Sequence, residues 1–147
     1  MFRSILVGTD GSATAETAVS QAIELAGSLG ADLQIVCAYE PVPQSRVRTE
    51  AEVAPRDVAW LLGPREDVDA TLEAARARAD GAGVTVHTFA RQGDPADAIL
   101  DVAEETGADL IIIGNKGMTG AKRFLLGSVP NKVSHHAPCS VLIIRTT

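Results

Sequence analysis

The fifteen residues GNKGMTGAKRFLLGS at positions 114–128 contain four glycines, two lysines and an arginine. The apolar run DLIIIG at 109–114 leads into them, and Pro130 follows soon after their end. A flexible, basic loop that leaves a buried strand suits a site where backbone amides approach a negatively charged group. The spacing is Gly114-x-x-Gly117, then nine residues, then Gly127-Ser128, and it predicts an anion-binding loop.

A second candidate stretch, GTDGSAT at 8–14, follows the first apolar run, SILVG at 4–8. The carboxylate of Asp10 could accept hydrogen bonds from ribose hydroxyls or hold a divalent cation beside phosphates. Asp-Gly-Ser is also a common turn sequence, so a purely structural role for Asp10 is the alternative.

The elements that must position both stretches are short apolar runs that alternate with helical patterns. The expected strands are 4–8, 32–39, 109–114 and 140–145, together with 84–90, which alternates more, as a strand near a sheet edge would. Helical spacing of apolar residues predicts a helix between Ser12 as N-cap and Gly30 as stop, and further helices around 68–79, over 94–107 and over 128–136.

The stretch 94–107 carries the clearest helix signals. Asp94 is the expected N-cap, Pro95 suits the first turn, Asp97 occupies the capping-box position, and Gly107 closes the helix. The connector 40–63 has three prolines and no regular pattern. It is either a lid over a site or a variable surface loop.

Five strands joined by helical crossovers predict one α/β domain over residues 1–147, a doubly wound parallel sheet with helices on both faces. In such a sheet, ligands bind beyond the carboxyl ends of the strands, where the strand order reverses. We call residues 114–128 the glycine loop. If the first and fourth strands are neighbours at that point, Asp10 and the glycine loop face each other across one crevice.

Common nucleotide motifs are missing from both stretches. The loop lacks G-x-x-x-x-G-K-[ST], and no G-x-G-x-x-G follows the first strand. A phospho-receiver domain would need an acidic pair after the first strand, where only Asp10 is present. The chain supplies neither a Walker lysine nor a general base with an orienting partner, so we do not expect a dedicated enzyme.

Taken together, GTDGS after the first strand, G-x-x-G-(nine residues)-G-S after the fourth and VLII in the fifth resemble the universal stress protein family over the whole chain. The resemblance implies strand order 3-2-1-4-5, a homodimer and ATP binding, because in that family the glycine motif marks the members that bind ATP. The chain is also similar to an actinobacterial subgroup that binds cyclic AMP. The ligand therefore stays open between ATP, with or without Mg²⁺, AMP and cyclic AMP. The nucleotide-site residues that the resemblance implies are Gly8, Thr9, Asp10, Ala38, Gly114, Lys116, Gly117, Gly127, Ser128 and Val129, with Asp10 also the candidate Mg²⁺ ligand.

Each position of the motif also has a physical interpretation. A missing Cβ at Gly114 lets backbone approach a ribose or phosphate, and a positive φ at Gly117 turns amides towards phosphates. Gly127 and Ser128 open the last helix, where amides and the helix dipole favour an anion. The Ser128 hydroxyl either caps that helix or donates to a phosphate oxygen. By analogy with family members, the backbone of Ala38 reads the adenine edge.

Composition and charge restrict the compartment and the partners. The net charge of −6 argues against a general binder of nucleic acids or anionic membranes. We find no export signal and no apolar run long enough to span a bilayer. Cys37 and Cys139 lie in apolar runs without metal-ligand spacing, which suggests reduced core thiols in a cytoplasmic protein.

In the order 3-2-1-4-5, the strand 140–145 lies at a sheet edge, yet it is apolar and contains neither proline nor lysine. Such an edge invites strand pairing, which predicts an antiparallel homodimer through these residues. The sequence thus predicts a cytoplasmic, adenine-nucleotide-binding stress-response protein. The alternatives are a slow ATP hydrolase or transferase, and an interaction module whose nucleotide only stabilises the fold. The protein client is not predicted.

Overall fold

Strands and helices alternate along the chain in the computed structural model, which describes residues 1–39, 64–115 and 126–146. The elements are β1 (Ser4–Gly8), α1 (Ala13–Leu29), β2 (Asp32–Tyr39), α4 (Pro64–Gly81), β3 (Val86–Gln92), α5 (Pro95–Thr106), β4 (Leu110–Gly114), α6 (Ser128–His136) and β5 (Ser140–Ile144). The connector 40–63, predicted to be either a lid or a surface loop, lies outside the described residues.

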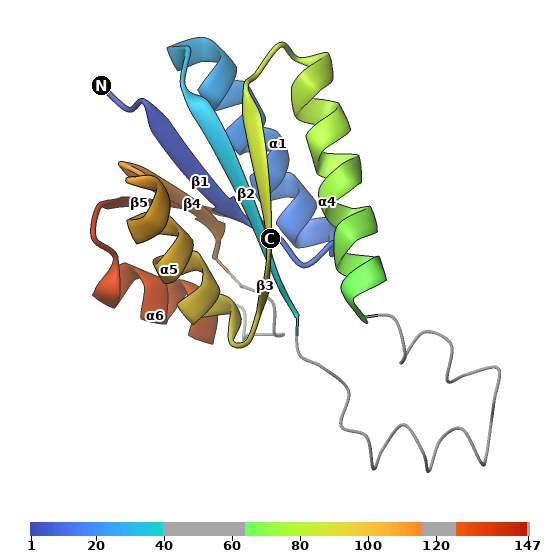
Figure 1. Ribbon diagram of the computed structural model, residues 1–147. Helices are drawn as coiled ribbons and strands as arrows, with labels where there is room; N and C mark the ends of the chain where they lie inside the picture. The colour runs from blue at the N-terminus through green and yellow to red at the C-terminus, as the bar shows by residue number, and fades with distance from the viewer. Residues whose placement is uncertain (40–63, 116–125, 147) are drawn as a thin grey trace, which may run out of the picture.

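The five strands form one parallel sheet in the order β3-β2-β1-β4-β5, which confirms the predicted architecture. Figure 1 shows α1 and α4 on one face of this sheet and α5 and α6 on the other. The chain runs outward from β1 to β3, then returns to place β4 on the other side of β1. The strand order therefore reverses between β1 and β4.

The strands are apolar because helices cover both faces of the sheet. Ile5, Leu6 and Val7 of β1 are fully buried. Ile5 and Val7 pack in the cluster beneath α1 and α4, whereas Leu6 packs in the cluster beneath α5 and α6. Full burial of one such side chain is worth roughly 1.5–3 kcal/mol, so a strand with no polar face is favoured at the centre of the sheet. None of the described helices is long and apolar enough to cross a bilayer.

The helix ends confirm most of the predicted caps. The Ser12 hydroxyl accepts from Ala15 N at the start of α1, and Gly30 ends that helix with a left-handed φ of 64°. The Asp94 carboxylate accepts from Asp97 N at the start of α5, and Gly107 ends α5 in the left-handed conformation. The predicted helix 128–136 is confirmed as α6, and of the two roles considered for Ser128 the cap is excluded, because Gly127 occupies the N-cap position and Ser128 is the first helical residue.

The third strand begins two residues later than its sequence pattern suggests. Val84 is buried, but its N–H donates to Ala79 O and so closes the turn after α4. The ladder with β2 begins at Val86, opposite Leu33, and continues to Gln92. The apolar pattern from residue 84 therefore combines a helix-closing residue with the strand proper.

Candidate functional site

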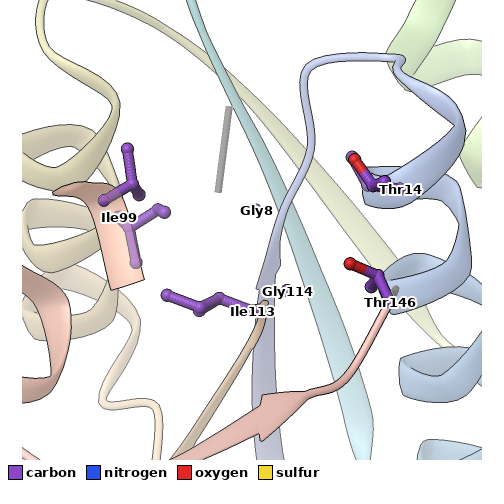
Figure 2. Close-up of a pocket in the computed structure, with 8 residues that line it drawn as sticks. Gly8, Thr14, Ile99, Ile113, Gly114 and Thr146 are labelled. Atoms are coloured by element: carbon purple, nitrogen blue, oxygen red, sulfur yellow. The ribbon is translucent and has the colours of Figure 1, made fainter. Parts of the chain in front are cut away.

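The carboxyl ends of β1 and β4 lie side by side, as the prediction of a shared crevice requires. Val7 pairs with Ile112, so the chain leaves both strands at the same edge of the sheet. A small crevice opens there, and the space between its walls comes to about 330 Å³ only when the open solvent at its mouth is counted. It is lined by Gly8, Thr14, Ala15, Ile99, Ile113, Gly114, Val129 and Thr146. Figure 2 shows the side chains of Thr14 and Thr146 on one side and those of Ile99 and Ile113 opposite.

The turn after β1 is held by its own side chains. Thr9 is fully buried, its N–H donates to Val36 O at 2.9 Å, and its hydroxyl accepts from Gly11 N at 3.1 Å. The Asp10 Oδ1 atom accepts from Ser12 N at 2.9 Å, which is the turn role considered for this residue. Asp10 itself is exposed beside the crevice, so its contact with ribose or a cation stays a prediction.

Helix α4 supports this turn from outside the crevice. Gly11 has a φ of +82°, and a Cβ on it would lie 3.1 Å from the Thr71 hydroxyl oxygen. A side chain at residue 11 would therefore be strained by its φ and crowded by Thr71. Thr71 had no signal in the sequence, because its partner is far away along the chain.

The donor set around Asp10 is too small for a metal site made by protein alone. Within residues 1–39, 64–115 and 126–146, no three His, Cys, Asp or Glu side chains are placed to hold a metal ion. Mg²⁺ commonly takes one or two carboxylates together with substrate phosphates. A role for the Asp10 carboxylate as one ligand of Mg²⁺ therefore stays a prediction.

The space into which a side chain of Gly114 would point is already filled by protein. A Cβ added to Gly114 would lie 3.3 Å from the Thr146 Cγ2 methyl group and 4.0 Å from Thr14 O. The approach of a ribose or phosphate to the Gly114 backbone stays a prediction, since Gly114 also lines the crevice. In the described residues, the missing side chain makes room for the segment that follows β5.

Asn115 joins three parts of the chain. Its N–H donates to Ile144 O at 2.9 Å, and its carbonyl accepts from Gly127 N at 3.0 Å. The Asn115 Oδ1 atom accepts both from Thr146 N at 2.8 Å and from the Thr146 hydroxyl at 3.0 Å. Asn115 was not among the predicted site residues, although an asparagine directly after a strand-ending glycine can indicate a residue that braces a loop.

Helix α6 begins at the edge of the crevice. Gly127 is buried at its N-cap, and Val129 contributes a buried side chain to the crevice wall. Ser128 is exposed beside it. The first turn contains no acidic residue, so the positive end of the helix dipole is not opposed within that turn. Lys116 and Gly117 lie outside the described residues, and their assigned roles stay predictions.

An ion pair fixes α6 against α5, whose side chains form part of the crevice wall. The Lys132 ammonium lies 2.8 Å from Asp97 Oδ1 and 3.5 Å from Asp94 Oδ2. Its hydrogen bond to Asp97 raises the pKa of Lys132. All three side chains are largely exposed, so the contacts orient the helices more than they stabilise the fold.

The end of β2 supplies Ala38 and Cys37. Ala38 is half-buried and pairs with Arg91 of β3. Cys37 is 3% exposed, and burial raises its pKa from 9.0 to about 11, with the negative charge of Asp10 adding to the effect. A thiol with this pKa is protonated at neutral pH, in keeping with the expected core role.

Comparison with known proteins gives a consistent result over the chain. The sequence profile of the universal stress protein family matches residues 1–145. A universal stress protein of Mycobacterium tuberculosis is 35% identical over 147 residues, covering 99% of this chain and 98% of that protein. The crystal structure of a universal stress protein in complex with cAMP is 32% identical, with a TM-score of 0.72 and coverage of 99% and 98%. The universal stress protein UspA from Lactobacillus plantarum is 26% identical, with a TM-score of 0.76 and coverage of 98% of both chains.

Cys37 should react slowly with alkylating reagents in the folded protein. A pKa of about 11 in place of 9.0 leaves about 100-fold less thiolate at pH 8, and burial adds a steric barrier. The measurement is iodoacetamide labelling of Cys139→Ser, native and in denaturant, followed by mass spectrometry from pH 7 to 10. Equal native and denatured rates would contradict the assigned burial. The variant Cys37→Ser reports the half-buried Cys139 as a reference.

Proposed function

The chain belongs to the universal stress protein family, and from that premise we propose that it binds an adenine nucleotide in the crevice between β1 and β4. The observation that carries the proposal is the meeting of Gly8, Gly114 and Val129 in one crevice at the reversal of the strand order. These residues come from both candidate stretches of the sequence. A family relative crystallised with cAMP supports the ligand class.

The proposed roles follow the position of each element. Phosphates lie at the glycine loop and the start of α6, near Lys116, Gly117, Gly127 and Ser128, where amides and the helix dipole favour an anion. Asp10 accepts from the ribose or ligates a nucleotide-bound Mg²⁺. Thr9 keeps the Asp10 turn in place through its buried hydroxyl.

At the end of β2, the backbone of Ala38 contacts the adenine. A backbone contact can distinguish the hydrogen-bonding edge of a base without a dedicated side chain. The half-buried position of Ala38 at the open end of the sheet is compatible with this role.

ATP, with Mg²⁺, is the proposed ligand, and the protein acts as a cytoplasmic regulator of stress responses, not as a dedicated enzyme. Cyclic AMP is the second candidate, favoured by the cAMP complex of the relative. The two ligands differ in charge and in phosphate reach, so they make different demands on the glycine loop. A cyclic monophosphate uses fewer amides than a triphosphate does.

Isothermal titration calorimetry distinguishes these ligands. If triphosphate contacts dominate, ATP with Mg²⁺ binds more tightly than AMP and competes with cyclic AMP for one site. Cyclic AMP binding clearly more tightly than ATP would assign the chain to the second candidate.

ATP turnover should stay below about 1 per second, the low end of typical enzymes. Faster turnover that Asp10→Ala abolishes would contradict the binding role.

The glycine loop can be tested at Gly117, with its neighbour Lys116 as control. Gly117→Val should leave the fold intact, which circular dichroism checks, and should weaken nucleotide binding by roughly two to four orders of magnitude. That range follows from losing two charge-assisted amide contacts of about 1.5–3 kcal/mol each. Lys116→Ala should cost far less, because an exposed lysine contributes screened charge. Normal binding by Gly117→Val, or a larger loss for Lys116→Ala at two salt concentrations, would refute the proposal that backbone amides of the glycine loop bind the phosphates.

A homodimer through β5 is part of the proposal. β5 is an edge strand that pairs only with β4 within the described sheet. Its Leu142 side chain is 39% exposed, and Val141 and Ile143 are half-buried. A second copy that adds its own β5 in antiparallel fashion would cover these apolar side chains and pair the strand edge.

Leu142→Lys should convert the dimer to a monomer, because pairing would bring two added lysines together at an apolar interface. His87→Lys is the control, since His87 is exposed on β3 at the opposite edge of the sheet. Sedimentation at micromolar concentration should give a dimer for wild type and His87→Lys. A monomeric wild type, or a dimer that Leu142→Lys leaves intact, would contradict the proposal.

A further inference from the structure

Two backbone hydrogen bonds of Asn115 fix the base of the glycine loop. Its carbonyl binds the N–H of Gly127, so the two ends of segment 116–126 are joined directly. Its N–H binds the Ile144 carbonyl at the end of β5. These contacts survive any change of the Asn115 side chain, because they use only main-chain atoms.

The side chain makes a separate link, to Thr146. A backbone N–H can only donate, so the atom of the Asn115 amide group that faces Thr146 N must be the acceptor Oδ1. The same oxygen accepts from the Thr146 hydroxyl. Chemistry therefore settles the orientation of the amide group, and the Nδ2 donor faces away from Thr146 N. We call this pair of hydrogen bonds the Asn115–Thr146 clasp.

The clasp places Thr146 in the crevice wall. The Thr146 side chain lines the crevice, and its methyl group lies against the backbone of Gly114 (Figure 2). No element of regular secondary structure contains Thr146, which follows the end of β5. Its position over Gly114 thus depends on the two hydrogen bonds to Asn115.

We propose that Asn115 is a positioning residue for the phosphate end of the bound nucleotide, acting through the Asn115–Thr146 clasp. The inference rests on the proposed nucleotide function. Without the clasp, the segment after β5 is released from Gly114, and the crevice wall formed by Gly114 and Thr146 loses its shape. Nucleotides whose phosphates bind at this wall lose affinity, whereas a nucleoside without phosphate does not.

The test measures ATP, cyclic AMP and adenosine binding by calorimetry for wild type, Asn115→Ala, Thr146→Val and the double variant. Asn115→Ala should weaken ATP and cyclic AMP about tenfold and change adenosine less than twofold. Thr146→Val keeps the backbone donor and should weaken both nucleotides about threefold. The double variant should resemble Asn115→Ala, because both changes remove the same link. A merely structural role would weaken all three ligands together.

Thr106→Val is the matched control, because it also removes one threonine hydroxyl bond, to Val102 O at 2.7 Å, but in the last turn of α5. It should leave all three affinities unchanged. Hydrogen exchange gives an independent measure of the clasp. The Thr146 amide should exchange at least tenfold faster in Asn115→Ala than in wild type.

Besides an equal loss of affinity for all three ligands, three outcomes would overturn the inference, and they differ from one another. Unchanged exchange at Thr146 would show that the clasp does not hold the segment. Faster exchange with unchanged ATP and cyclic AMP affinity would show that the clasp does not position phosphates. A wild type that binds none of the three ligands would overturn the proposed function itself, and the positioning role with it.

Discussion

The parallel pairing of β1 with β4 is the constraint on which the rest of the molecule depends. It puts two strands from distant parts of the chain side by side, with helices over both faces. Their side chains must be apolar along the whole strand, so polar chemistry is confined to the strand ends. The turn after β1 and the loop after β4 leave the sheet at one edge, and the crevice forms between them.

Local signals in the sequence were sufficient for most of the elements. Ser12 with Gly30 and Asp94 with Gly107 delimit their helices through contacts within a few residues, which a sequence displays directly. The strand order is a different matter, because apolar periodicity does not encode which strands are neighbours. That order came from the family resemblance, and the structure confirms it.

The parts of the site that escaped prediction depend on contacts between distant residues. Nothing in the sequence indicated that Thr146, 32 positions after Gly114, packs against this glycine. Asn115 looked like an ordinary loop residue, although it connects β4, the start of α6 and the segment after β5. Gly127 instead of Ser128 caps α6, because that glycine adopts the extended N-cap conformation and donates its amide to Asn115.

The hydrogen bond between Gly127 N and Asn115 O also affects how this fold can change during evolution. A segment whose two ends are joined at its base transmits little of its own conformation to the strand and helix beside it. The entropic cost of closing a chain segment grows slowly with its length, by about 0.6 kcal/mol for each doubling. A change of length between residues 116 and 126 should therefore cost the sheet little, and we expect ligand preference in the family to diverge at this loop more readily than the core does.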